Sequence, residues 1–254
     1  IDDLQAQGRF AFTMQEAVAA IGTAPEAAQA GLRRLKNKGH VASPYRGFYV
    51  VVPPEYRGLG CLPADQFVPE LMGHLGHSYY VGLLSAARYH GAAHQAPMVF
   101  QVVVASARRD IECGAVKIGF VASKDAVDTP VIERNTRTGR IRIAAPEATA
   151  LELVGYPKQC GYLDNVATVL AELHERIDAS ALQAEARRAP AAWLQRLGYM
   201  LELVEAEELA AALDSVVEER QPVVAPLASW KGMAGAPRDA RWRLAINIEV
   251  EPDL

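Results

Sequence analysis

The sequence predicts an α+β protein: an N-terminal winged helix-turn-helix followed by a larger mixed α/β domain with a helical C-terminal part. Three observations predict this class. Residues 13–52 read as two helices and a short β-hairpin, residues 98–143 contain strand-like runs, and residues 162–219 keep a helical period. A length of 254 residues allows two domains. Prolines and glycines over 53–60 mark a boundary, so we place the domains at 1–58 and 59–254.

The N-terminal segment carries clear helix-start signals. A short helix is expected over 1–8. Thr13 and Glu16 have the spacing of a capping box, in which each side chain bonds a backbone N–H of the first turn. Thr23 and Glu26 repeat the spacing, with Pro25 near the first helical position. We therefore expect a second helix to begin near residue 14 and a third to run over 24–37.

The helix expected over 24–37 divides into two faces when residues are placed 100° apart. One face holds small and apolar residues, which are Ala24, Ala28, Gly31, Leu32 and Leu35. The other holds Glu26, Gln29, Ala30, Arg33 and Asn37, with Arg34 and Lys36 at its margins. Taken alone, this pattern is typical of any solvated amphipathic helix. It also suits a major groove, because Gln and Arg can make bidentate contacts to base edges.

The residues that follow favour DNA binding. Lys38 and Gly39 end the helix, and two strands over 40–43 and 47–51 enclose a tip that carries Tyr45 and Arg46. A basic hairpin after two helices is typical of a wing that lies along a phosphate backbone. We expect Gln29 and Arg33 to contact base edges. The residues expected to contact the DNA backbone are Arg34, Lys36, Lys38, Tyr45 and Arg46.

Charge is distributed unevenly. The whole chain has a formal net charge of −4. Between residues 31 and 58, however, six basic residues face one acidic residue, a net of +5. Residues 200–254 hold eleven acidic and five basic residues, a net of −6. A basic module attached to an acidic body suits localised phosphate binding, because counterion release depends on local charge.

The rest of the chain predicts strands followed by helices. Residues 98–104 are almost all apolar, as in a central strand covered on both faces. Residues 242–250 alternate apolar and polar, which predicts a final strand. The other expected strands lie at 116–121 and 140–143, and the expected helices at 64–75, 79–91, 146–154 and within 162–219, where Asp178 and Pro190 mark helix starts.

The sequence contains few patterns that indicate catalysis, metal binding or cofactor binding. His90 and His94 have ligand spacing on a helix, but the HExxH glutamate is absent and no cysteine lies near. Cys61, Cys113 and Cys160 are far apart and lack CxxC spacing, which favours a reducing cytoplasm over a zinc site or a disulfide framework. No phosphate-binding glycine motif or nucleophile elbow occurs. We expect no cofactor, no metal and no catalytic residue, hence not an enzyme.

A second basic cluster lies near the middle of the chain and consists of Arg134, Arg137, Arg140 and Arg142. Two interpretations stay open: an exposed hairpin that happens to be basic, and an auxiliary DNA contact beside the winged helix.

Five segments together resemble a known family. They are Leu32–Gly39 leading into Tyr45–Val50, Tyr80–Ala87 with His90-Gly91, Pro146–Leu151, Arg196–Tyr199 and Trp242–Asn247. In this order they resemble the AbiEi-type antitoxins of type IV toxin–antitoxin systems, over essentially the whole chain.

The resemblance implies a transcriptional autorepressor and antitoxin that serves phage defence by abortive infection. Its winged helix would bind inverted repeats in double-stranded DNA of its own promoter, as a monomer in solution with two copies on the operator. Its C-terminal antitoxin domain would counter an AbiEii-type nucleotidyltransferase toxin, without needing a stable complex. A cytoplasmic location and no membrane association are expected.

Two other functions stay open at this point. A nuclease targeted by the winged helix would need clustered carboxylates and a lysine. Asp110, Glu112, Asp125 and Asp128 are candidates, but no Glu-x-Lys occurs. Alternatively, the winged helix is a protein-interaction module.

Overall fold

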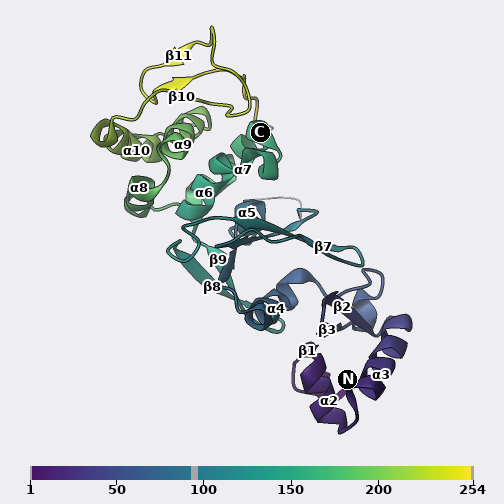
Figure 1. The fold of residues 1–254 in the computed structure, drawn as a ribbon. Helices are drawn as coiled ribbons and strands as arrows, with labels where there is room; N and C mark the ends of the chain where they lie inside the picture. The colour runs from purple at the N-terminus through teal and green to yellow at the C-terminus, as the bar shows by residue number, and fades with distance from the viewer. Residues whose placement is uncertain (1, 93–96, 253–254) are drawn as a thin grey trace. The chain divides into compact units, whose positions relative to one another are not determined.

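The computed structural model describes residues 2–92 and 97–252 (Figure 1), and the fold is mixed α+β. The chain divides into two compact units, each built from two stretches. The first contains Ile1–Val81 and Pro97–Ile143, and the second Gly82–Ala96 and Ala144–Leu254. The domain border expected near residue 58 falls inside the first unit. That residues 1–58 form a domain of their own stays a prediction. No helix within the described ranges has both the length and the hydrophobicity needed to cross a lipid bilayer.

The first unit begins with three helices and a small sheet. Its elements are α1 Asp2–Ala6, β1 Ala11–Thr13, α2 Met14–Ile21, α3 Pro25–Asn37, β2 Val41–Tyr45 and β3 Phe48–Val51. The strands form an antiparallel sheet in the order β1-β3-β2. Strand β1 was not predicted from the sequence, because it has only three residues; it pairs along Phe48–Val50. Helices α2 and α3 pack against each other, as Figure 1 shows.

The two expected capping boxes turn out differently. At Thr13 both bonds form: the Glu16 N–H donates to Thr13 Oγ1 at 3.2 Å, and the Thr13 N–H donates to Glu16 Oε2 at 2.7 Å. The box expected at Thr23 is wrong, because α3 has Ala24 as its N-cap and no side-chain cap bond. The residue before a proline prefers extended backbone, and Ala24 has φ −61° and ψ 147°. Pro25 therefore becomes the first helical residue.

A six-stranded sheet forms the rest of the first unit, in the order β6-β7-β5-β4-β9-β8. Its strands are β4 Tyr79–Val81, β5 Phe100–Val104, β6 Ile111–Cys113, β7 Val116–Ala122, β8 Val131–Thr136 and β9 Gly139–Ala144. The short helices η1 Pro54–Tyr56, η2 Ala64–Gln66 and α4 Val68–Leu75 come between the two sheets in sequence. Strand β5 lies inside the sheet with Val102, Val103 and Val104 buried, so the predicted central strand is confirmed.

The helix expected over 79–91 begins later than predicted. Tyr79, Tyr80 and Val81 form β4, which pairs antiparallel with Val102–Val104 of β5. The helix α5, Leu83–Tyr89, follows after Gly82 and belongs to the second unit. The small residues that predicted a helix occur only from Gly82 onward, whereas the two tyrosines bury aromatic rings in the sheet.

The second unit is mainly helical. Its elements are α5, α6 Pro146–Gly155, η3 Pro157–Cys160, α7 Tyr162–Leu173, η4 His174–Arg176, α8 Ala179–Arg188, α9 Ala191–Leu203, α10 Glu207–Arg220, β10 Ala225–Pro226, β11 Arg238–Asp239 and β12 Leu244–Ala245. Pro146 stands at the start of α6, and Asp178 caps α8 by accepting from the Ala181 N–H at 2.9 Å. Both helix starts agree with the sequence prediction.

The final strand is much shorter than its alternation predicted. Only Leu244 and Ala245 pair, in a sheet of order β10-β12-β11. Beyond these two residues, the Asn247 side chain makes hydrogen bonds to the backbone of Ala228. Its Oδ1 accepts from the Ala228 N–H at 2.8 Å and its amide donates to the Ala228 carbonyl at 2.9 Å. A side chain here replaces the ladder that a longer strand would have made.

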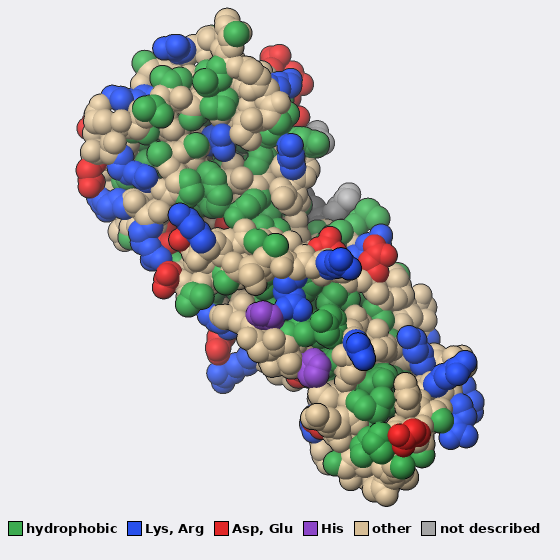
Figure 2. All heavy atoms as spheres, viewed as in Figure 1, with side chains coloured by type: hydrophobic (Ala, Val, Ile, Leu, Met, Phe, Trp, Pro, Cys, Tyr) green, Lys and Arg blue, Asp and Glu red, His purple; other side chains and the backbone are tan. Residues whose placement is uncertain are grey.

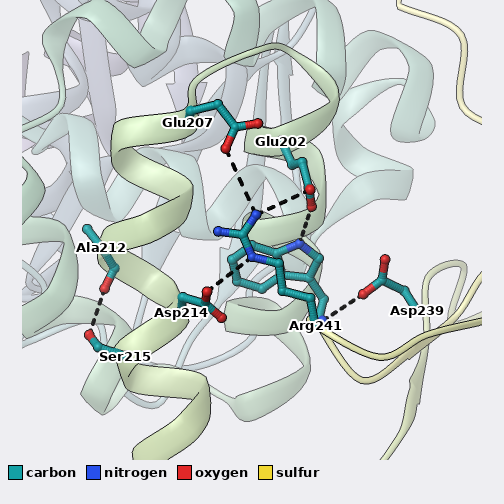
Figure 3. A network of polar contacts seen from close by, with 8 residues as sticks. Glu202, Glu207, Ala212, Asp214, Ser215, Asp239 and Arg241 are labelled. Atoms are coloured by element: carbon teal, nitrogen blue, oxygen red, sulfur yellow. Dashed lines mark hydrogen bonds and ion pairs between the residues drawn. The ribbon is translucent and has the colours of Figure 1, made fainter.

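Trp242 and Arg241 join the C-terminal loops to α9 and α10 respectively. Trp242 is fully buried, and its Nε1–H donates to Glu202 at 2.6 Å. Arg241 lies over the Trp242 ring at 4.8 Å and pairs with both Glu202 and Asp214 at 3.2 Å (Figure 3). These charges have a structural role, because each is matched by a neighbour within the unit.

Candidate nucleic-acid interface

The helix α3 separates its side chains largely as its sequence predicts, except that Ala24, expected on the apolar face, is exposed and precedes the helix as its N-cap. Ala28 and Leu32 are buried, 2% and 6% exposed respectively, and hold the helix against its neighbours. Gln29 and Arg33 are exposed on the opposite side. Arg34, Lys36 and Lys38 are exposed or partly exposed as well. The helix ends at Asn37 with Lys38 as its C-cap, and Gly39 takes the left-handed conformation, φ 70°, that turns the chain toward β2.

The hairpin tip is held from two sides. The Ser43 hydroxyl donates to the carbonyls of Tyr45 at 3.0 Å and Phe48 at 3.1 Å. The Met14 N–H donates to the Gly47 carbonyl at 2.9 Å, which ties the tip to the start of α2. Tyr45 and Arg46 are left exposed on this tip. The hairpin therefore presents one aromatic and one cationic side chain from a defined backbone.

The cations of this surface are unpaired. Within the described ranges, no ion pair involves Arg33, Arg34, Lys36, Lys38 or Arg46. Figure 2 shows Lys and Arg side chains gathered over α3. Unpaired cations on one surface keep their full attraction for an external polyanion, because no neighbouring carboxylate neutralises them.

The second basic cluster differs from the first because internal partners engage it. Arg137 pairs with Glu55 at 2.8 Å and lies over the Phe10 ring at 5.7 Å. Arg140 pairs with Glu133 at 3.1 Å, and Arg142 donates to Ser78 at 3.3 Å. Arg134 is exposed. Three of these four arginines thus have protein partners, which favours a structural over a DNA-binding role for them.

Among the described residues, the histidine and carboxylate candidates do not assemble a site. A ring nitrogen of His90 is hydrogen-bonded to the Ala144 carbonyl at 2.8 Å, while His94 lies outside the described residues. Asp110 accepts from the Phe120 N–H at 3.0 Å. Among the residues that the structure describes, no three His, Cys, Asp or Glu side chains are placed to hold a metal ion.

One neighbour of α3 was not predicted from the sequence. Lys36 acts electrostatically on Cys113, which ends β6 and lies far along the chain from the helix. The two residues come together because β2, which follows α3, packs against β6. No local pattern could have indicated this contact.

Comparison with known proteins identifies the domain that follows the N-terminal segment. Residues 80–203 match the AbiEi antitoxin C-terminal domain. No curated protein matches the chain. Among solved structures, the crystal structure of the RV2827C protein from Mycobacterium tuberculosis is similar, with a TM-score of 0.66 and 17% identity. That similarity covers 96% of this chain and 88% of the other, and at this identity it shows the fold alone.

This match shows that the chain carries the antitoxin domain of a toxin–antitoxin system. The matched domain is that of the AbiEi antitoxins, so the resemblance to AbiEi-type antitoxins inferred from the sequence is confirmed.

Proposed function

We propose that the protein is a DNA-binding transcriptional regulator as well as an antitoxin, and that residues 1–58 form a winged helix-turn-helix. Support comes from the order α1-β1-α2-α3-β2-β3, in which two packed helices precede a hairpin, with a third strand pairing beside it. The observation that carries the proposal is the exposed, unpaired basic surface formed by α3 and the tip at Tyr45 and Arg46.

Side-chain chemistry suggests two roles on this surface. Gln29 and Arg33 lie one helical turn apart on the exposed face, so both can enter one major groove and bond base edges. The remaining residues carry point charges or a hydroxyl that suit phosphate oxygens. They are Arg34, Lys36, Lys38, Tyr45 and Arg46.

The antitoxin domain gives the DNA binding a context. We infer that the protein represses its own operon by binding inverted repeats, as a monomer in solution with two copies on the operator. Its second function is to counter a nucleotidyltransferase-like toxin, without a stable complex being required and without an enzymatic activity of its own. The site of this action is the cytoplasm, and the process served is phage defence.

The test is an electrophoretic mobility shift with the DNA upstream of the protein's own gene and with unrelated DNA of equal length. Arg33→Ala should weaken binding to the upstream DNA more than to unrelated DNA, by about 1–3 kcal/mol, because it removes base-edge bonds. Arg46→Ala should weaken both by a similar factor, because phosphates are the same in every sequence. Arg238→Ala removes an exposed arginine from the second unit and should change neither.

Two results would contradict this proposal. Equal losses for Arg33→Ala on both DNAs would remove the base-reading role of α3. No shift of either DNA by the unaltered protein would instead favour a protein-interaction role for the segment.

A further inference from the structure

Two cysteines far apart in sequence meet in the first unit. Cys61 follows the loop after η1, and Cys113 ends β6. Their neighbours are in backbone contact: the Ala115 N–H donates to the Leu59 carbonyl at 2.7 Å, and a Cβ on Gly60 would lie 3.3 Å from the Gly114 Cα. The two side chains are close enough that each thiol shifts the pKa of the other.

The two thiols have opposite environments. Cys61 is fully buried, and its pKa is raised first by the neighbouring Cys113 thiol and then by burial, which disfavours a thiolate. Cys113 is half-buried. The neighbouring Cys61 thiol lowers the pKa of Cys113; burial opposes this, and Lys36 and the Ser43 N–H add to the lowering. Cys113 is thus the thiol that ionises, and Cys61 the one that keeps its proton.

The charged surroundings agree with this division. Lys36 comes from α3 and Ser43 from β2. On the hairpin of β6 and β7, Glu112 and Lys117 pair with each other at 3.2 Å, so the Glu112 charge next to Cys113 is balanced. A low-pKa, partly exposed cysteine beside a second thiol is the arrangement in which oxidation gives a disulfide.

We propose that Cys61 and Cys113 are a reversible redox pair, in which Cys113 reacts with a hydroperoxide and Cys61 closes an intramolecular disulfide. A disulfide that forms and breaks in a reducing compartment is regulatory rather than structural. It differs in this respect from the disulfide framework that the sequence argues against.

The chemistry balances in two steps. The Cys113 thiolate attacks one peroxide oxygen, the O–O bond breaks, and the other oxygen leaves and takes up a proton, which gives Cys113 sulfenic acid and an alcohol, or water from hydrogen peroxide. The Cys61 sulfur then displaces the hydroxyl: an S–S bond forms, the S–O bond breaks, and the Cys61 proton leaves with the hydroxyl as water. In sum, two thiols and one hydroperoxide give a disulfide, an alcohol and water.

Cys160 is an internal control. It is fully buried in the second unit, and burial raises its pKa. A buried, protonated thiol reacts slowly with peroxide, so this cysteine should stay reduced while the other two are oxidised.

The test uses the full-length reduced protein and a few equivalents of hydrogen peroxide. After denaturation and blocking with N-ethylmaleimide, the oxidised protein should carry two adducts fewer than the reduced protein. A non-reducing digest should yield the peptide pair joined through Cys61 and Cys113, and dithiothreitol should reverse the change. Unchanged adduct numbers, a cross-link between chains or a cross-link through Cys160 would each overturn the proposal.

Variants test the assignment of roles. In Cys61→Ser, Cys113 should stop at the sulfenic acid and be trapped by dimedone, whereas Cys113→Ser should give no dimedone adduct on Cys61. The reverse labelling would overturn the assignment. Lys36→Gln should slow the reaction at neutral pH by a few-fold, because loss of the positive charge raises the Cys113 pKa and lowers the thiolate fraction, while the higher intrinsic nucleophilicity offsets part of that loss. The matched change Lys124→Gln, at an exposed lysine of the same unit, should leave the rate unaltered, and equal rates in the two variants would remove Lys36 from the site.

Discussion

Single residues decide where the helices of the N-terminal segment begin. Thr13 and Thr23 stand at the head of the same four-residue spacing, yet only Thr13 forms a capping box. The difference is Pro25, which forces extended backbone on Ala24 and moves the helix start by one residue. The spacing is visible in the sequence, but the competition between a cap and a proline is decided only when the backbone is built.

This difference predicts unequal mutational effects. Thr13→Ala should lower the free energy of unfolding by about 1 kcal/mol, because an N-terminal N–H loses its partner. Thr23→Ala, whose side chain makes no cap bond, should change it by a few tenths of a kcal/mol. Urea denaturation of both variants beside the unaltered protein measures this. Equal losses would show that the box at Thr13 does not stabilise α2.

The same box makes stability depend on pH. Burial alone would raise the pKa of Glu16, but bonds from Arg9 and Thr13 outweigh it, and the pKa is lowered from its ordinary 4.5. A carboxyl with a lowered pKa stabilises the fold above that ordinary value, and the contribution is lost as pH falls through the folded pKa. The stability difference between Glu16→Gln and the unaltered protein, measured by urea denaturation at pH values above and below 4.5, should therefore shrink below pH 4.5.

At the scale of elements, close packing in the second unit depends on glycine. A Cβ on Gly198 of α9 would overlap the Trp242 ring. The ring cannot move freely, because its Nε1–H is bonded to Glu202 and Arg241 covers its face. Helix α9 and the C-terminal loop therefore approach each other closely at Gly198.

Gly198→Ala should destabilise the protein by about 1–3 kcal/mol through overpacking. This outweighs the gain of up to about 1 kcal/mol that alanine gives in a helix. Gly232→Ala is the matched control in the same unit, because nothing lies within 4 Å of its added Cβ. Thermal unfolding followed by circular dichroism compares the two, and a stabilised Gly198→Ala variant would contradict the packing described.

Elements with strong local signals could be predicted from the sequence. The faces of α3, the buried strand β5 and the starts of α6 and α8 all follow from periodicity and capping residues. The alternation over 242–250 predicted a strand that is only two residues long. Alternation gives two faces to an extended chain, but a strand also needs a partner, and here Asn247 binds the neighbouring loop instead.

At the scale of the whole molecule, the uneven charge is the clearest feature that the sequence and the structure share. Arg33, Arg34, Lys36, Lys38 and Arg46 remain exposed and make no ion pair in the described structure, whereas the arginines of the second cluster are mostly engaged. Composition alone predicted the location of the first surface. It could not separate the two clusters, because ion pairs such as Arg137 with Glu55 join residues distant in sequence. The proximity of Cys61 and Cys113 was hidden for the same reason.

The most direct test of the proposed DNA surface is the salt dependence of DNA affinity, measured by fluorescence anisotropy with DNA from the upstream region. The logarithm of affinity should fall linearly with the logarithm of salt concentration. In the triple variant Arg34→Ala, Lys36→Ala and Arg46→Ala, the slope should become shallower by about 2.7, because each phosphate that a cation neutralises contributes about 0.9 to it. A slope identical to that of the unaltered protein would contradict the assignment of this surface to nucleic acid.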